Sequence, residues 1–379
     1  MKKPSKNNLA WQIRQNVLRR KRRVRENRSG RYRVSIKVLK DKLADLDRIG
    51  VKATITKGRK VQVYLPEVMN FSSECDITIA YMNLIRQLAS KRGKNFPGRL
   101  ESVNFNGLRK ISSSAALVLT AEMSKWDDSC AYCLKPRFEE WSPEIVRKFY
   151  ELGYFNLFKG GPKESYFENK DFDVSLIKYI KQSTSAESKI RVLKTRLKSD
   201  LQSIIGDSIE KWTFLHSGLS EAVTNVTHHA YPQPASFLSR DRNWYLTGAF
   251  SSRTNELKVV FYDQGVGIPK SLPKSKMWER AIGYIAELGV DFADRHADSV
   301  LLKAAVEMSR TRTDDEDRGK GLQDLLQFIR MYRDGYLSIL SRRGLYKFSC
   351  ENGTEKIKSD RFEYPIEGTL IIWRVQLKG

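Results

Sequence analysis

The chain contains little cysteine and no long apolar stretch. Its 379 residues include four cysteines, too few for a disulfide framework in a chain of this length. One pair is closely spaced, Cys130-Ala-Tyr-Cys133, and since no second pair lies nearby we favour reduced thiols over a zinc or redox site. No apolar run approaches the ~18 residues that a membrane span needs, and the basic N-terminus lacks the apolar core of a secretory signal. We therefore expect a cytoplasmic protein without membrane contact.

Acidic residues are scarce at the start of the chain. Residues 1–40 hold fifteen Lys or Arg against one acid, Glu26, and so carry fourteen of the twenty-four net positive charges. A basic arm at 1–33 favours a polyanion, either nucleic acid or an acidic protein surface. No zinc-finger or RNA-binding signature supports nucleic acid, so a solvated tail is an equal alternative. We assign 1–50 to this arm and to a helix that ends at Gly50.

The next segment alternates between strand and helix patterns. We expect strands at 53–56, 60–65 and 100–105, and helices at 77–88, 112–126 and 141–158. Ser112 or Ser113 suits the N-cap of the second helix. The cluster Gly160-Gly161-Pro162 predicts the end of this domain, and the Lys-rich segment 177–205 reads as a helical connector or as the entry helix of the next domain.

A strand, a short turn, a serine cluster and a helix in succession resemble the STAS fold of anti-sigma factor antagonists. Those proteins usually carry Asp-Ser-Ser-Gly at the turn, whereas this chain has Ser112-Ser-Ser-Ala115. The resemblance implies a degenerate STAS-like domain over 51–160. Because the acid and the glycine are absent, we expect the serines to cap and pack the helix rather than accept a phosphoryl group.

A second group of motifs begins on an amphipathic helix at 218–231. Glu221 and Asn225 are four residues apart and therefore share one face of that helix. The carboxylate can take a proton from water, and the amide oxygen can ligate a hard cation such as Mg²⁺. For this pair alone, a solvated polar face is the more common explanation.

Three later motifs favour a functional site over a solvated polar face. The buried-strand pattern 257–262 leads into Asp263-Gln-Gly-Val-Gly267, Arg318-Gly-Lys-Gly-Leu322 opens a helix, and Gly368-Thr369 precedes the strand 370–373. In this order the four motifs resemble the boxes of the GHKL ATPases. The first box, with Glu221, Asn225, His229, Ala230 and Tyr231, is most similar to the anti-sigma serine-kinase branch.

The resemblance implies an α/β (α+β) fold class, with a GHKL-type α/β sandwich at 201–379 and a connector or entry helix at 161–200. On the adenine side it implies that the Asp263 carboxylate accepts a hydrogen bond from the exocyclic amine. Gly265 and Gly267 would let the backbone approach the ring, and Thr369 would support this side through its hydroxyl.

On the phosphate side, the resemblance implies a Mg²⁺ ligand at Asn225 and a general base at Glu221. Gly319 and Gly321 would present backbone N–H groups at a helix N-terminus, and Lys320 would add a charge. The polar segment 309–317 lies where the family places a mobile lid.

Histidine is rare, and none of the four histidines precedes His216. A histidine autokinase needs an upstream phosphoacceptor histidine, so we expect instead an ATPase or a kinase of protein serine. The alternative is a nucleotide-gated module with little turnover that binds a protein or nucleic acid. Pairing with a second copy stays open. The fusion of the two modules suggests a bacterial regulatory or mobile-element system.

Overall fold

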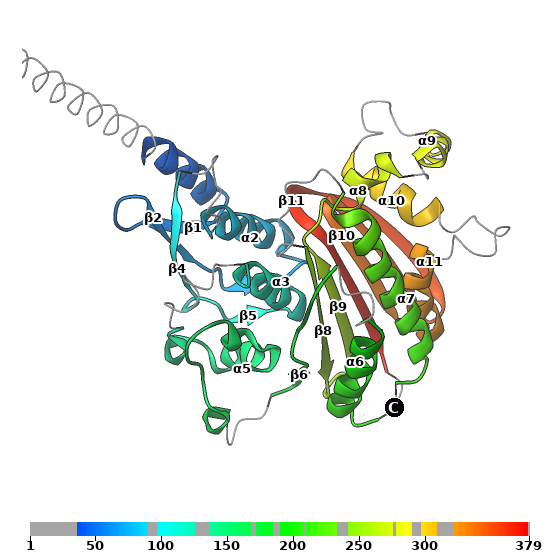
Figure 1. Cartoon of the computed structure of the whole chain (residues 1–379), viewed down its shortest axis with the longest axis horizontal. Helices are drawn as coiled ribbons and strands as arrows, with labels where there is room; N and C mark the ends of the chain where they lie inside the picture. The colour runs from blue at the N-terminus through cyan, green and yellow to red at the C-terminus, as the bar shows by residue number, and fades with distance from the viewer. Residues whose placement is uncertain are drawn as a thin grey trace, which may run out of the picture. The chain divides into compact units, whose positions relative to one another are not determined.

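The computed structural model (Figure 1) has helices and mixed sheets, so the α/β fold class is confirmed. The chain divides into two compact units, 1–65 with 84–104 and 66–83 with 105–379. The expected boundary near residue 160 therefore lies inside the second unit. The structure describes residues 36–89, 97–125, 136–167, 172–184, 190–207, 209–232, 242–275, 278–289, 297–308 and 321–377. The arm 1–33 and the pair Cys130 and Cys133 lie outside these ranges.

The first unit begins with a helix at 36–48 that ends, as predicted, before Gly50, whose φ of 92° only glycine adopts readily. Its three-stranded sheet pairs β1 (Lys52–Ile55) with β2 (Lys60–Tyr64) antiparallel and β2 with β4 (Arg99–Asn104) parallel. The three strands lie close to their predicted positions. The residues of α2 (Cys75–Ala89) are divided between the two units.

The second unit contains a short parallel pair, β3 (Val68–Met69) with β5 (Lys110–Ile111), that the sequence did not predict. Ser112 follows β5 and caps α3 (Ser113–Met123), since its Oγ accepts a hydrogen bond from the backbone N–H of Ala115 at 3.1 Å. The helix expected at 141–158 is divided into α5 (Pro143–Leu152) and a 3₁₀ turn (Tyr154–Leu157). Gly153 divides them with a left-handed φ of 84°.

A six-stranded antiparallel sheet forms the centre of the second unit. Its order is β10-β11-β9-β8-β6, and β7 also pairs with β8. Its strands are β6 (Val174–Leu176), β7 (Ile180–Ser183), β8 (Asn243–Ser251), β9 (Glu256–Asp263), β10 (Gly335–Glu351) and β11 (Thr354–Gln376).

The helical prediction for 177–205 is wrong in its first part. Among the described residues of this segment, 180–183 form β7 and Ile190–Ile205 form the helix α6. The free edge of β8 explains the difference, because it offers backbone partners that a local helix would forgo. The N–H of Ile177 donates to the carbonyl of Gly248 at 2.9 Å, and the Thr247 hydroxyl donates to the carbonyl of Ile177 at 2.7 Å.

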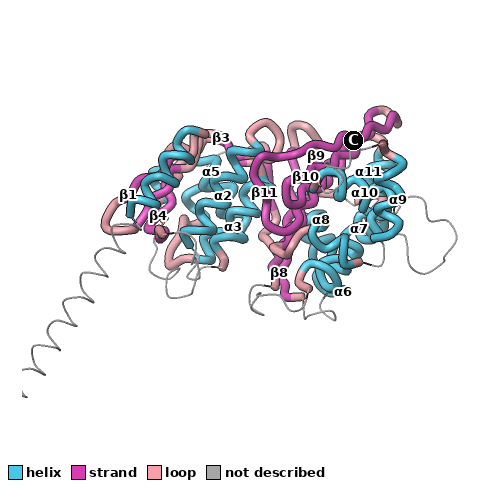
Figure 2. Tube along the Cα trace, turned by 90° about the horizontal axis from the view of Figure 1, so that it is seen from above, coloured by secondary structure: helices cyan, strands magenta, loops and turns pink. Residues whose placement is uncertain are grey.

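Helices cover both faces of this sheet. On one face α6, α7 (Trp212–Asn225) and α11 (Gly321–Tyr332) share a hydrophobic core with β8, β9, β10 and β11. On the other face α3 packs against β8 and β9, and both views place these strands between α3 and α7 (Figures 1 and 2). Eight of the nine residues of β8 are buried, as expected for a strand covered on both sides.

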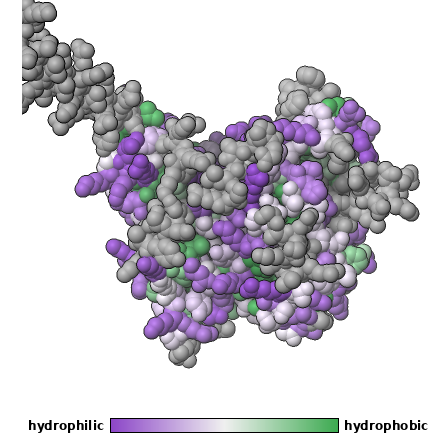
Figure 3. All heavy atoms as spheres, in the orientation of Figure 1, coloured by the Kyte–Doolittle hydropathy of each residue, from purple (hydrophilic) through white to green (hydrophobic). Residues whose placement is uncertain are grey.

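Three smaller helices lie beside this sheet: α8 (Ile268–Ser271) and α10 (Asp298–Met308) pack against β10, and α9 (Trp278–Glu287) packs against α10. On the face shown in Figure 3, hydrophobic residues form small separate areas among hydrophilic ones. Within the described residues, no helix is both long and apolar enough to cross a membrane.

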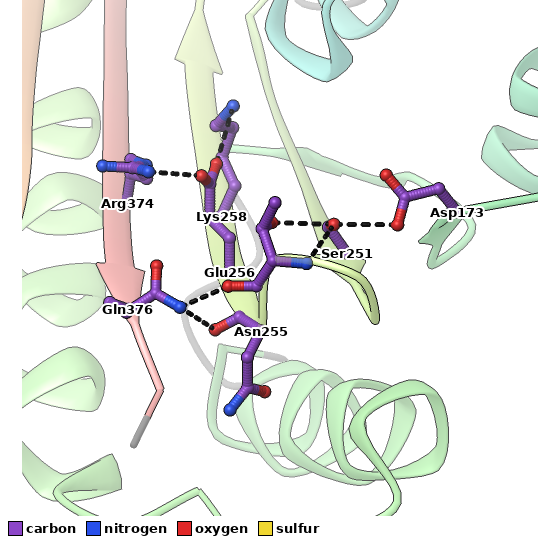
Figure 4. Close-up of polar contacts among 8 residues, drawn as sticks. Asp173, Ser251, Asn255, Glu256, Lys258, Arg374 and Gln376 are labelled. Atoms are coloured by element: carbon purple, nitrogen blue, oxygen red, sulfur yellow. Dashed lines mark hydrogen bonds and ion pairs between the residues drawn. The ribbon is translucent and has the colours of Figure 1, made fainter. Parts of the chain in front are cut away.

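The end of the sheet farthest from Asp263 is held by polar contacts (Figure 4). Arg374 Nη2 lies 2.6 Å from Glu256 Oε2, and Lys258 Nζ lies 3.5 Å from Glu256 Oε1. Burial opposes ionisation of Glu256, but the hydrogen bond from Arg374 and the charge of Lys258 hold its pKa below the usual value. The ionised pair therefore joins β11 to β9.

We expect Arg374→Met to lower the free energy of unfolding by about 1–2 kcal/mol at pH 7, because it removes a charged hydrogen bond that is mostly shielded from water. A depressed carboxyl pKa stabilises the fold above about pH 4.3, the unfolded value, and this contribution disappears as the pH falls through the folded pKa. The loss measured by urea unfolding should therefore shrink below pH 4. Lys356→Met, in the exposed 4.0 Å pair with Glu351, should change stability by less than about 0.5 kcal/mol.

Candidate functional site

The helix that carries Glu221 and Asn225 is α7, and the two side chains meet as predicted. Asn225 Nδ2 donates to Glu221 Oε1 at 2.8 Å, and both residues are partly buried. The helix does not end there but widens into a π-helical turn, Val226–Ala230. Such turns insert an extra residue and are frequent at functional sites. The sequence pattern did not predict this turn.

Asp263 lies at the end of β9, on the face of the sheet that α7 covers. Leu257, Val259 and Phe261 belong to the core shared with α7, and Asp263 continues their alternation. Its side chain is 4% exposed. One carboxylate oxygen accepts from the backbone N–H of Gly265 at 2.8 Å. The buried strand thus places one acid on the face of the sheet against which α7 packs.

Thr369 stands opposite Asp263 in the β11–β9 register. Burial raises the pKa of Asp263 to about 7; hydrogen bonds from Gly265 and from the hydroxyl and backbone of Thr369 lower it, and the charge of Glu367 raises it. This carboxyl therefore changes charge close to neutral pH, and its hydrogen-bond donors come from two of the predicted motifs.

The glycines of these motifs are required by contacts within the chain itself. A Cβ on Gly265 would overlap the carbonyl oxygen and Cβ of Ala230, and a Cβ on Gly368 would overlap the backbone of Asp263. Gly267 has a φ of 84°. The N–H of Val266 donates to the Ala230 carbonyl at 2.9 Å. The Asp263 loop is thus pressed against the π-helical turn on one side and β11 on the other.

Ser341 is a residue of this site that the motif pattern did not identify. It is fully buried, and its Oγ donates to the carbonyl of Gly368 at 3.0 Å and accepts from the N–H of Ile268 at 2.9 Å. Its Oγ also lies 3.1 Å from Thr369 Oγ1. The only sequence signal is a small polar residue inside an apolar strand. Ser341 ties the end of the Asp263 loop to the Gly368-Thr369 turn.

Glu122 on α3 supports the opposite face of the same strand end. Its Oε1 accepts hydrogen bonds from Tyr262 Oη at 3.1 Å and from Gln264 Nε2 at 3.0 Å, and the side chain is 2% exposed. Tyr262 and Gln264 flank Asp263 and point away from it, as alternate residues of a strand do. Gln264 Oε1 is buried without a hydrogen-bond partner among the described residues. A buried acid far away in the sequence thus holds the residues on either side of Asp263.

Tyr231, the last residue of the first box, also holds this loop. Its hydroxyl donates to the carbonyl of Asn243 at 2.8 Å and accepts from the N–H of Gln264 at 3.3 Å. Burial, followed by the charge of Asp263, raises its pKa far above the usual value, so it stays neutral. The box that carries Glu221 and Asn225 is therefore bonded directly to the loop that follows Asp263.

The remaining predicted site residues are described only in part. Gly319 and Lys320 lie outside the described residues, while Gly321 is the first residue of α11, which packs beside α7. The described residues contain no cluster of three or more His, Cys, Asp or Glu that could hold a metal ion. The site therefore offers two groups to a ligand. The buried carboxylate of Asp263 can accept a hydrogen bond, and the amide oxygen of Asn225 can coordinate Mg²⁺.

A comparison of the chain with protein-family models, and with the sequences of curated proteins, finds no match.

The packing of Gly265 predicts a strong effect of a single methyl group. Gly265→Ala should lower the free energy of unfolding by about 1–3 kcal/mol, because the new Cβ forces the loop away from Ala230. Gly283→Ala is the matched control, since open space surrounds that position on α9. It should be neutral or stabilise by up to about 1 kcal/mol. Equal urea midpoints for the two variants would contradict the close approach.

Asp263 predicts a specific dependence of stability on pH. A carboxyl whose folded pKa is raised stabilises the fold below the unfolded value near 3.9, and this contribution is lost as the pH rises to about 7. Asp263→Asn cannot ionise, so its stability relative to the parent should rise between pH 4 and 7, by about 4 kcal/mol at most. Urea unfolding at each pH measures the difference, and parallel curves would show that Asp263 has an ordinary pKa.

Proposed function

We propose that residues 201–379 form a GHKL-type site for Mg-ATP, most similar to the anti-sigma serine-kinase branch, in a cytoplasmic regulatory protein. The observation that carries this proposal is the convergence of three separate motifs on Asp263. Gly265 belongs to the same motif as Asp263 and donates to its carboxylate. Ala230 and Tyr231, at the end of the first motif, contact the loop that follows Asp263. Gly368 and Thr369, the last motif, lie against Asp263 from β11. Motifs that only happened to occur in this order would have no reason to meet.

In this proposal Asp263 binds the adenine ring. Its ionised carboxylate accepts a hydrogen bond from the exocyclic amine, which guanine lacks at that position. Thr369 and Ser341 hold the carboxylate and the adjoining turn in place through their hydroxyls. Because burial brings the pKa of Asp263 to about 7, the carboxylate form, and with it nucleotide affinity, increases as the pH rises through that value.

Asn225 and Glu221 act on the phosphate side. The Asn225 amide nitrogen is engaged by Glu221, which leaves its carbonyl oxygen as the atom suited to Mg²⁺. When bound, Mg²⁺ would neutralise part of the negative charge of the phosphates. Glu221 is the general base that takes the proton from the attacking hydroxyl, either of water or of a protein serine. Gly319, Lys320 and Gly321 complete the phosphate side in this proposal.

The second candidate is a nucleotide-gated binding module with little turnover. The contact between Glu122 on α3 and Gln264 favours it, because a change in the Asp263 loop is transmitted to a layer outside the nucleotide motifs. In this case the protein partner, or a nucleic acid bound by the arm 1–33, would respond to nucleotide. Release of labelled γ-phosphate, with and without such partners, distinguishes turnover from gating.

We also propose a STAS-like segment at 51–160, supported by the order of its elements. Two parallel strand pairs are present, β2 with β4 and β3 with β5, and α2 and α3 follow strands in the chain. Ser112 caps α3, and Ser113 and Ser114 are buried, which agrees with a structural role for the serines.

The proposal predicts different effects for the two residues of α7. Glu221→Ala should retain ATP binding and lower turnover by roughly 10²–10⁴-fold, the usual contribution of a general base. Asn225→Ala should lose the Mg²⁺-dependent part of ATP binding together with turnover. The measurements are nucleotide affinity with and without Mg²⁺, and phosphate release.

Thr224→Ala provides the control on the same helix, because Thr224 is exposed and its hydroxyl donates a hydrogen bond to the carbonyl of Ser220 in that helix. It should behave like the parent. If Glu221→Ala and Asn225→Ala also bind and turn over ATP like the parent, the two side chains form an ordinary polar pair, and their proposed roles as general base and Mg²⁺ ligand are refuted. If the parent itself neither binds nor turns over ATP, the nucleotide site is refuted.

A further inference from the structure

A cavity lies where the two short parallel strands of the second unit end. Val68 pairs with Lys110 and Met69 with Ile111, so β3 and β5 finish at the same edge. The residues that follow them, Asn70 and Ser112, line a cavity of about 290 Å³ that is closed from the side by α5. The carboxyl ends of parallel strands are where α/β proteins commonly bind ligands.

The charged residues of this cavity are mainly cationic. Arg109, Lys110 and Lys148 contribute three positive charges, and Glu144 contributes one negative charge. With all four ionised, the lining carries a net charge of +2, opposite in sign and about equal in magnitude to the charge of a phosphomonoester at neutral pH. The rest of the lining is partly apolar, with Ile111 and Ile145 among its residues.

Lys148 is the cation whose position requires an explanation. Its Nζ donates to the carbonyl of Ile111, the last residue of β5, at 2.6 Å. Burial and then the charge of Lys258 lower its pKa, while Glu144 and Glu151 raise it. Glu151 is already paired with Arg147 at 2.6 Å and also accepts the N–H of Leu176. No carboxylate forms an ion pair with Lys148 among the described residues.

The other two cations lie at the exposed rim. The side chains of Arg109 and Lys110 are exposed, and neither forms an ion pair among the described residues. Their backbone N–H groups both donate to the carbonyl of Glu67, which holds this loop in place. An arginine fork can bind two phosphate oxygens at once, and a lysine adds a point charge.

The polar side chains at the strand ends, Asn70 and Ser112, form hydrogen bonds with nearby backbone groups. Asn70 Oδ1 accepts from the N–H groups of Ser72 and Glu74 at 2.8 and 3.2 Å. Ser112 Oγ caps α3. Recognition therefore falls to the three cations, of which Lys148 is partly buried and Arg109 and Lys110 are exposed.

We propose that this cavity binds a small phosphomonoester, with Lys148 and Arg109 as its main ligands and Lys110 as a supporting charge. A volume of about 290 Å³ is at the lower end of small-molecule sites, which suits a phosphorylated sugar or glycerol rather than a nucleoside triphosphate. The site is separate from the Asp263 site and does not depend on the nucleotide proposal.

The test is calorimetric titration of the full chain with glycerol 3-phosphate and with inorganic phosphate. Glycerol serves as the uncharged control and glycerate as the carboxylate analogue. We expect saturable binding of both phosphates, weaker binding of glycerate and none of glycerol. Lys148→Met should weaken glycerol 3-phosphate binding at least tenfold and Arg109→Gln about three- to tenfold, the latter without risk to the fold because Arg109 is exposed.

Two controls make the result decisive. Lys163→Met removes an exposed lysine outside the cavity and should leave affinity unchanged. Asp263→Asn should also leave glycerol 3-phosphate binding unchanged, which separates this site from the nucleotide site. The proposal is overturned if neither phosphate binds saturably, if glycerate binds as tightly as glycerol 3-phosphate, or if Arg109→Gln and Lys163→Met have equal effects.

Discussion

The second unit depends on the burial of β9 on both of its faces. Alternate residues of this strand enter two different packed layers, the core under α7 and α11 on one side and the contact with α3 on the other. A shift of one residue in its register would exchange these two sets. Asp263 would then point toward α3, and Tyr262 and Gln264 would enter the apolar core. The register of the strand therefore determines which layer Tyr262, Asp263 and Gln264 enter.

The polar groups at the end of β9 are costly to bury, and the chain compensates for each of them separately. Asp263 is met by Gly265 and Thr369, and Glu122 is met by Tyr262 and Gln264. A buried polar atom without a partner costs about 1–3 kcal/mol, so these bonds hold the loop in one conformation. The partial exception, Gln264 Oε1, is next to the residue on which the nucleotide proposal rests. This concentration of buried polar groups is typical of sites that bind or react.

The two proposed ligand sites use opposite electrostatics. At Asp263 a single carboxylate, neutralised in part by burial, suits a hydrogen-bond donor such as an adenine amine. At the ends of β3 and β5, cations that form no ion pair with the described residues suit a dianion. Glu122, on the helix that Ser112 caps beside the second cavity, also contacts the loop of the first site. One helix, α3, thus lies between the two sites and contacts residues at both.

Local patterns were sufficient for the features that depend on neighbours in the chain. The apolar run of β9, the shared face of Glu221 and Asn225 and the helix end at Gly50 were predicted, and the helix cap was narrowed to Ser112 or Ser113, because each depends on a few consecutive residues. The order of the motifs could also be read directly. The α/β fold class was expected from the resemblance that these motifs carry.

Only the tertiary structure decided which distant residues support the site. Glu122 and Gln264 are 142 residues apart and Ile268 and Ser341 are 73 apart, so no local period relates them. The strand β7 formed where a helix was predicted because the edge of β8 supplies hydrogen bonds that the segment cannot find alone. The glycines have the same explanation, since Gly265 and Gly368 are required by backbone that arrives from elsewhere in the chain. The spacing of apolar residues predicts which face of a helix or strand is buried. Which residues pack against that face depends on the tertiary structure of the whole unit.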